Sequence, residues 1–172
     1  MDASSKFQNT LPTTPTILLQ KLDDLGIIFD KFDHPPLFTV NDAKLHQKNM
    51  IGVHVKNLFL RDKKKNNFLI VTEQDTIINL KTIPSKIGSD RLSFGSQERL
   101  WRYLGVRPGA VSPLALINDL TRSVTLIFQD ILQTEEKIHF HPLVNDISVA
   151  VKLNDLSCFF EFTGHKPMFV NL

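Results

Sequence analysis

The segment VHVKNLFLR, residues 53–61, contains the first side chain with an evident chemical use. It is a strand candidate, and alternation places Lys56 on one face with Leu58 and Leu60, whereas Asn57 faces the other way. A lysine on an apolar face either borders a cleft or extends out of the core to water. At a cleft, its ammonium would lie close to the negative charge of a bound substrate.

A second candidate is the stretch GVRPGAVSPLAL, which has two glycines and two prolines within nine residues. Such a sequence indicates a backbone held in special conformations rather than a loose linker. The N–H groups of the turn before Pro113 could donate to an oxyanion; they belong to Gly109, Ala110, Val111 and Ser112. Taken alone, the stretch is better explained as a tight connection between two elements than as a functional site.

Two further motifs lie in the C-terminal third of the chain. His141 precedes a proline, and Gly164-His165-Lys166-Pro167 follows a helix candidate. Each has a structural explanation when taken singly, because His141 can be a satisfied core histidine and Gly164 a helix cap.

The usual catalytic and metal-binding signatures are absent from the sequence, which has no GxSxG, HExxH, Walker loop or GxGxxG. His139 and His141 alternate along one strand candidate, but no other histidine has a spacing that recommends it as a third ligand. We therefore expect no metal and no cofactor. Cys158 lies beside Phe159 and Phe160 in a helix candidate, which predicts a buried, inert thiol.

Two groups of side chains have a nucleic-acid interpretation. Lys63, Lys64 and Lys65 are expected at a solvated hairpin tip, where they also protect the sheet edge, or else they contact RNA phosphates as point charges. Trp101 and Tyr103 lie on an amphipathic helix candidate, where core and rim packing is favoured over base stacking.

Composition describes the body that must hold these residues. The 172 residues are 42% hydrophobic and 22% charged, which predicts one soluble domain over residues 14–172, after a frayed polar lead-in at 1–13. The net charge of +2 is too even for a protein that coats nucleic acid, so any RNA contact must be local. The single cysteine fits a reducing compartment, which predicts the cytoplasm, and no apolar run has the length of a membrane span.

Helix signals occur at four places. Thr14 before Pro15 predicts a first helix that ends at Gly26. Ser96 is expected to cap a helix that ends at Gly105, and Asn154 one that ends at Gly164. A brief helix is expected at residues 41–47.

Strand signals alternate with these helices without a regular rhythm. Strands are expected at residues 27–32, 53–61, 68–73, 124–128, 138–140 and 147–151, with an edge strand at 168–170. The polar DKKKNN between the second and third predicts an antiparallel hairpin. We therefore predict an α+β fold, a single domain with a mixed, mostly antiparallel β-sheet flanked by helices.

Taken together and in this order, LSFGSQERLWRYLGVRPGAVSPLALIND, HPLVND and FTGHKP resemble the YbaK and prolyl-tRNA synthetase editing-domain family. The likeness is closest to its freestanding PrdX or ProXp-ala branch, and it runs from about Leu18 to the C-terminus. It implies a metal-independent trans-editing deacylase, which cleaves the ester between a wrongly attached amino acid and the terminal adenosine of tRNA. The branch implies alanyl-tRNA(Pro) as substrate.

The resemblance also implies roles for individual residues. Lys56 matches the lysine at the pocket mouth, and His141 matches the histidine of the HPL motif. With the loop residues Gly109, Ala110, Val111 and Ser112, these are the expected catalytic positions. The expected substrate-binding positions are Asn57, Pro113, Gly164, His165 and Pro167.

Two alternatives stay open. A non-catalytic nucleic-acid or nucleotide binding module would explain the lysines, although not Lys56 on an apolar face or the rigid loop. The same deacylase chemistry could also act on cysteinyl-tRNA(Pro) or another mischarged tRNA. The expected partner is the acceptor end of mischarged tRNA(Pro), with prolyl-tRNA synthetase or other translation components as further candidates. We expect no membrane partner, and a monomer or weak homodimer.

Overall fold

The computed structural model describes residues 3–37, 44 and 50–172. These residues form an eight-stranded sheet in the order β1-β7-β6-β2-β3-β5-β8, with β4 paired to β2. Four of the described strand pairs are antiparallel and three are parallel, which confirms the predicted fold class. The strands are β1 (Phe29–Asp33), β2 (Val53–Arg61), β3 (Asn67–Glu73), β4 (Ser93–Phe94), β5 (Val124–Gln129), β6 (Ile138–Phe140), β7 (Ile147–Val151) and β8 (Met168–Val170).

The α-helices are α1 (Pro15–Asp24), α3 (Ile83–Ile87), α4 (Gln97–Leu104) and α5 (Ser157–Thr163), and 3-10 helices occupy Ser5–Thr10, Pro113–Asn118 and Asp130–Thr134. Two predicted caps are confirmed. The Thr14 side chain accepts a hydrogen bond from the N–H of Ile17 at 3.3 Å, and Ser96 accepts one from Arg99 at 3.1 Å. The helix expected at 41–47 lies outside the described residues.

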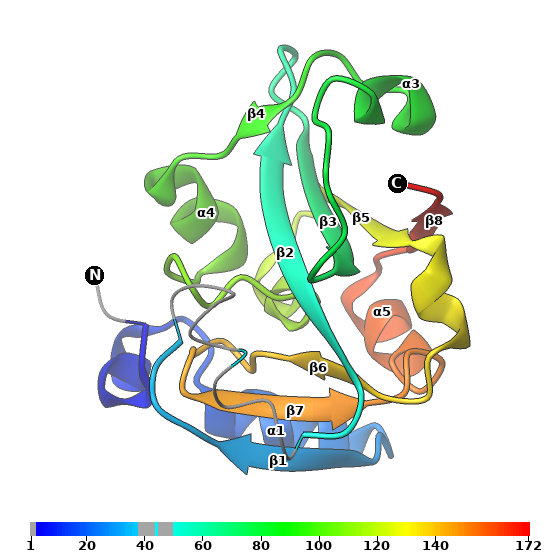
Figure 1. The fold of residues 1–172 in the computed structure, drawn as a ribbon. Coiled ribbons are helices and arrows are strands. Elements are labelled where there is room, and N and C mark those ends of the chain that lie inside the picture. The colour runs from blue at the N-terminus through cyan, green and yellow to red at the C-terminus, as the bar shows by residue number, and fades with distance from the viewer. Residues whose placement is uncertain (1–2, 38–43, 45–49) are drawn as a thin grey trace.

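Strand β2 belongs to both halves of the sheet. Its first residues, Val53 and His54, pair in parallel with β6, and its longer remainder pairs with β3 in the predicted antiparallel hairpin. Figure 1 shows β2 running from the lower group, β6, β7 and β1, up to the group that contains β3, β5 and β8. The predicted edge strand β8 is confirmed, because it pairs with β5 and ends the strand order.

Alternation along β2 sends neighbouring side chains into two different cores. Phe59 lies in the larger core with residues of α1, α4 and α5, whereas Leu60 lies in a smaller core with Ile83 and Leu92. This division confirms that the two faces of β2 are distinct, as the period of two requires.

Two predicted boundaries are wrong. Strand β1 begins at Phe29 rather than at residue 27, since Ile27 turns into the core while Ile28 is 82% exposed. Asn154 does not cap α5 with its side chain. The cap residue is Leu156, which makes no side-chain cap bond, and the Asn154 carbonyl accepts hydrogen bonds from Ser157.

Two predictions about exposure are also wrong. Cys158 is exposed rather than buried, because the inward face of α5 is defined by Leu156, Phe159 and Phe160 at helical spacing. The lead-in is not frayed where the structure describes it, since Ala3 is 4% exposed and packs into the larger core. Over residues 3–37, 44 and 50–172, no helix has both the length and the apolarity to span a bilayer.

Candidate functional site

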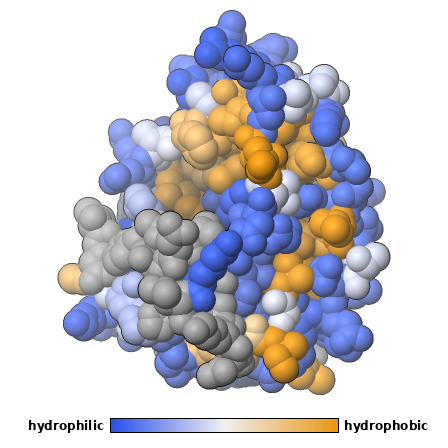
Figure 2. Space-filling model, viewed as in Figure 1, coloured by the Kyte–Doolittle hydropathy of each residue, from blue (hydrophilic) through white to orange (hydrophobic). Residues whose placement is uncertain are grey.

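The sheet has an opening along one edge of β2. On that edge β6 pairs only with Val53 and His54, and β4 only with Leu60 and Arg61. Between these contacts, the stretch at residues 55–59 has no strand partner on that side among the described residues. Figure 2 shows a recess with apolar walls between α4 and β2, at the place where the edge is open. A concave, largely apolar surface of this kind is where a small substrate group is expected to bind.

Lys56 lies in this unpaired stretch, and its ammonium is held in place. Its Nζ donates a hydrogen bond to the carbonyl of Gln74 at 3.0 Å and another to the carbonyl of Thr76. Both carbonyls belong to the turn that follows β3, so the lysine links β2 to that turn. An ammonium has three donors, and two are occupied here, which leaves one for a ligand.

Asn57 projects from the opposite face of β2, on the side of Val55 and Phe59. Its Oδ1 atom is buried and accepts no hydrogen bond from any described residue. An acceptor left unpaired in a buried position costs free energy, which a hydrogen-bond donor on a ligand would recover. Lys56 and Asn57 are neighbours in the sequence, but their side chains project from opposite faces of β2. They therefore do not line the same side of a cleft.

Four histidines from three segments gather on the Lys56 face, and sequence reasoning did not anticipate this. The rings of His54 and His139 stack with centroids 4.2 Å apart, and those of His34 and His141 lie 5.7 Å apart. The parallel pairing of β2 with β6 sets His54 directly beside His139. No group of three or more His, Cys, Asp or Glu side chains within the described ranges is placed to hold a metal ion.

Three histidines of this cluster, His54, His139 and His141, have lowered pKa values. Burial, together with the charge that His139 would carry, lowers the pKa of His54 to about 4. Burial likewise lowers the pKa of His141 to about 4, and it lowers the pKa of His139. The rings of these three histidines are therefore neutral at pH 7. His141 Nδ1 donates to the carbonyl of Ile147 at 2.8 Å, so its Nε2 is the acceptor nitrogen.

The glycine-proline loop is rigid, as the sequence predicts. Gly109 has a φ of 91°, and the N–H of Ala110 donates to the carbonyl of Arg107 at 3.1 Å. The Ser112 hydroxyl accepts from the N–H of Leu114 and so caps the 3-10 helix that begins at Pro113. In Figure 1 this connection passes between α4 and β6, on the side of β2 that has no strand partner.

The loop has fewer free donors than the sequence suggests. The N–H of Ala110 is already occupied, whereas those of Gly109, Val111 and Ser112 have no acceptor among the described residues. Ala110 and Val111 pack against the larger core, which also contains Phe59 from β2. The oxyanion donors that remain available are therefore the amides of Gly109, Val111 and Ser112.

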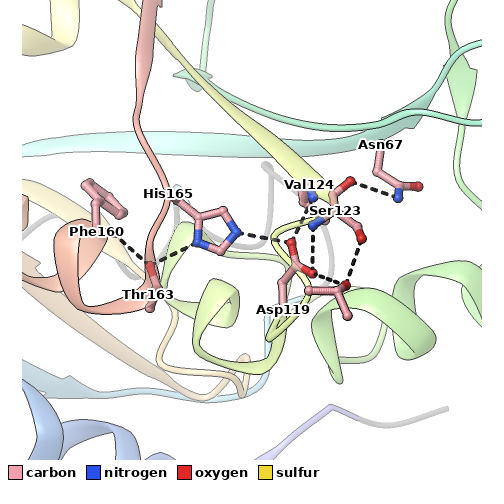
Figure 3. Close-up of polar contacts among 8 residues, drawn as sticks. Asn67, Asp119, Ser123, Val124, Phe160, Thr163 and His165 are labelled. Carbon is pink, nitrogen blue, oxygen red and sulfur yellow. Dashed lines mark hydrogen bonds and ion pairs between the residues drawn. The ribbon is translucent and has the colours of Figure 1, made fainter.

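The GHKP motif is remote from this opening. His165 Nε2 lies 3.1 Å from a carboxylate oxygen of Asp119, and its Nδ1 lies 3.0 Å from the hydroxyl of Thr163 (Figure 3). Asp119 also accepts hydrogen bonds from the backbone N–H groups of Ser123 and Val124. Strands β3 and β5 separate β2 from β8, the strand that follows the motif. Both ring nitrogens of His165 are thus used to hold the C-terminal segment against the start of β5.

The other two motif residues lie around the same segment. Gly164 ends α5 in a left-handed conformation with φ of 74°, and the Arg122 guanidinium lies so close that a Cβ would collide with it. Pro167 lines a groove of about 660 Å³ with Phe160 and Phe169. The structure therefore separates the expected substrate-binding residues Gly164, His165 and Pro167 from Lys56.

The three lysines of the hairpin tip are exposed, as predicted. Lys64 lies 3.5 Å from Asp90, and the carbonyl of Lys65 accepts a hydrogen bond from Arg99. Five residues of strand separate Lys56 from Arg61, where β2 ends, so the tip is roughly 17 Å or more from the ammonium. Any contact that Lys63, Lys64 and Lys65 make with RNA is thus separate from the opening.

Comparison with known proteins relates the chain to proteins of aminoacyl-tRNA editing. A model of the aminoacyl-tRNA editing domain matches residues 34–159. The chain is 36% identical over 149 residues to the prolyl-tRNA editing protein ProX of Acetoanaerobium sticklandii, a match that covers 86% of this chain and 91% of that protein. It is also 36% identical over 163 residues to the prolyl-tRNA synthetase associated domain-containing protein 1 of Danio rerio, with 91% and 89% covered.

Solved structures agree in fold. One described as a candidate trans-editing enzyme for prolyl tRNA synthetase matches with a TM-score of 0.68 at 15% identity. The match covers 92% of this chain and 97% of that one, and at this identity it supports the fold alone.

The histidine cluster predicts acid sensitivity. Because the pKa of His54 is about 4 in the folded chain and 6.5 ordinarily, the folded state binds fewer protons than the unfolded state between these values. The stability linked to His54 is complete above pH 6.5 and is lost as the pH falls towards 4. Urea unfolding of the wild type and His54→Gln between pH 4 and pH 8 should give a shallower pH dependence for the variant. Identical slopes would contradict this account.

The buried contact between Asp119 and His165 is expected to contribute strongly to the free energy of unfolding. Burial alone would raise the pKa of Asp119, but hydrogen bonds from His165, Ser123 and Val124 lower it below its ordinary value. His165→Ala removes the donor from a buried carboxylate and should lower the free energy of unfolding by about 3 kcal/mol. The neighbouring Lys166 is exposed, so Lys166→Ala should change the unfolding free energy little. Equal urea midpoints for the two variants would show that the pair does not stabilise the fold.

Proposed function

The chain belongs to the aminoacyl-tRNA editing domain family, and from this premise we propose that it is a trans-editing deacylase for alanyl-tRNA(Pro). Its activity as an aminoacyl-tRNA deacylase is supported by the likeness to ProX across most of both chains. The observation that carries the proposal is Lys56, which belongs to the unpaired stretch of β2 beside the apolar recess and whose ammonium is anchored by the turn after β3.

The reaction asks little of the protein beyond positioning. Water adds to the ester carbonyl, the bond to the ribose oxygen breaks, and a free amino acid and the ribose hydroxyl result. Because aminoacyl esters are already activated, a site that orients water and stabilises the developing oxyanion is sufficient. The free N–H groups of Gly109, Val111 and Ser112 are the oxyanion donors in this proposal.

Lys56 and His141 hold the terminal adenosine. The third ammonium hydrogen of Lys56 binds the phosphate or ribose oxygens of that nucleotide, since two carbonyls fix the direction of the other two. The neutral His141 accepts a hydrogen bond through Nε2, either from a ribose hydroxyl or from the attacking water. With a pKa of about 4 it is a weak base, so it orients the hydroxyl or water more than it removes a proton.

Selection of alanine over proline must come from exclusion. A difference of one or two methylene groups gives only about 1–3 kcal/mol of attraction, and it favours the larger side chain. A rigid wall that collides with the proline ring reverses this preference. The loop around Gly109 provides such a wall, because its turn is closed by the Ala110 bond to Arg107 and by the Ser112 cap.

The proposed function makes a prediction about the substrate. The purified chain should release alanine from alanyl-tRNA(Pro) at least 10-fold faster than it releases proline from prolyl-tRNA(Pro), the discrimination that a steric wall provides. Both deacylations should be timed side by side, with cysteinyl-tRNA(Pro) as a third substrate. Equal rates for alanine and proline would exclude the steric wall, faster release of cysteine would reassign the substrate, and no hydrolysis at all would favour a binding module.

The proposed function also makes a prediction about Lys56. Lys56→Ala should lower kcat/KM by about 10²- to 10³-fold, since it removes a charged contact from a partly enclosed site. Lys56→Arg is the matched variant, because it keeps the charge but not the geometry of the two carbonyl contacts. Replacing Lys63, Lys64 and Lys65 together should instead raise KM in a salt-dependent way, with kcat unchanged. A folded Lys56→Ala variant with wild-type kcat/KM would remove Lys56 from the site.

A further inference from the structure

The sequence favours core and rim packing for Trp101 and Tyr103. Tyr103 packs against the larger core, whereas Trp101 does not lie in the core. It is 41% exposed, whereas Leu100 and Leu104 on the same helix are 5% and 0% exposed. Helix α4 therefore turns its aliphatic side chains inward and presents its tryptophan to solvent. The function proposed above makes no use of this residue.

Trp101 borders a groove that is separate from the opening beside β2. The groove has a volume of about 550 Å³ and is lined by residues 10–13, by α4 and by the 3-10 helix Pro113–Asn118 with Leu120 beyond it. Leu120 is 88% exposed, so the groove has an apolar rim on the side away from α4. Its size is in the range of sites for small organic groups.

The floor of the groove is fixed by hydrogen bonds. The Thr13 hydroxyl donates to Asn118 Oδ1 at 2.6 Å, and Asn118 Nδ2 donates to the carbonyl of Leu104 at 2.8 Å. Gly105 has a φ of 60°, and a Cβ there would collide with Pro12 and lie 2.9 Å from Asn118 Nδ2. The groove is thus built before any ligand arrives, which lowers the entropic cost of binding.

The charge of the groove suits a polyanion. Arg102 lines it and is exposed, and none of the residues that line it is acidic. The Arg107 guanidinium lies 5.9 Å from the centroid of the Trp101 ring and 5.6 Å from that of Phe7, and it donates to the hydroxyl of Thr10 at 2.7 Å. An exposed indole beside two arginines is the combination that binds a nucleotide, because the ring stacks on the base and arginine pairs with phosphate.

We propose that this groove binds one nucleotide of the substrate tRNA other than the aminoacylated adenosine, with its base stacked on Trp101 and its phosphate beside Arg102 and Arg107. The inference rests on the deacylase function proposed above. The groove and the catalytic loop share one connection, since Gly105 lines the groove and Gly109 follows four residues later. A nucleotide held here therefore adds affinity for the whole tRNA without taking part in the reaction.

The binding experiment uses the fact that Trp101 is the single tryptophan of the chain. Titration with uncharged tRNA(Pro) should quench its fluorescence saturably. Arg102→Gln should reduce the slope of log Kd against log salt concentration by about 0.7 to 0.9. Absence of quenching, or quenching by an unrelated acidic peptide to the same extent, would overturn the proposal. The fluorescence titration does not depend on any hydrolytic activity.

The kinetic experiment separates this groove from the catalytic opening. Trp101→Ala should raise KM for alanyl-tRNA(Pro) by about 10- to 100-fold, with kcat unchanged, and should leave hydrolysis of alanyl-adenosine unchanged. Trp101→Phe should stay within a few fold of wild type. Phe162→Ala, at an aromatic position that is 51% exposed on α5, is the control and should have no effect.

Two outcomes of the kinetic experiment would overturn the inference. One is an unchanged KM for Trp101→Ala, and the other is an equal loss on alanyl-adenosine, which would mean that Trp101 acts through the opening itself. If the wild type hydrolyses neither substrate, the proposed function fails, and the fluorescence titration alone then decides whether the groove binds RNA.

Discussion

The alternation of side chains along β2 is the constraint on which the rest of the structure depends. One strand is shared by both halves of the sheet, so its two faces must satisfy two cores at once. Phe59 fills the larger core and Leu60 the smaller one, and a shift of one residue would exchange them. The same alternation leaves Lys56 and Asn57 on opposite faces, at the point where the sheet edge is open. The site is therefore a consequence of how the sheet is divided.

Electrostatics then decide which groups carry charge at this place. Burial keeps His54 and His141 neutral at pH 7, whereas Lys56, on the same face of β2 as His54, is anchored by two carbonyls. A neutral imidazole accepts a hydrogen bond, and an ammonium binds an anion, so the two kinds of side chain have complementary uses toward a nucleotide. The Asp119–His165 pair holds the C-terminal segment on the far side of β3 and β5, away from this chemistry.

The features that could be predicted from the sequence are those that local interactions determine. The hairpin of β2 and β3, the caps at Thr14 and Ser96, and the stiffness of the loop at Gly109 depend on neighbours in the chain. The histidine cluster could not be foreseen, because it depends on β2 pairing with β6 more than eighty residues later. Cys158 was misplaced for another reason: its apolar neighbours suggested a buried face that the helical period does not include.

The central claim, that the terminal adenosine binds at the opening of the sheet beside β2, is tested most directly by locating a substrate analogue. An amide-linked alanyl-adenosine resists hydrolysis and can be titrated into isotope-labelled protein while NMR signals are followed. The account predicts saturable shifts of the His54 and His141 ring signals and of the Lys56 ammonium. Shifts confined to α5 and β8, with those three side chains unchanged, would contradict it.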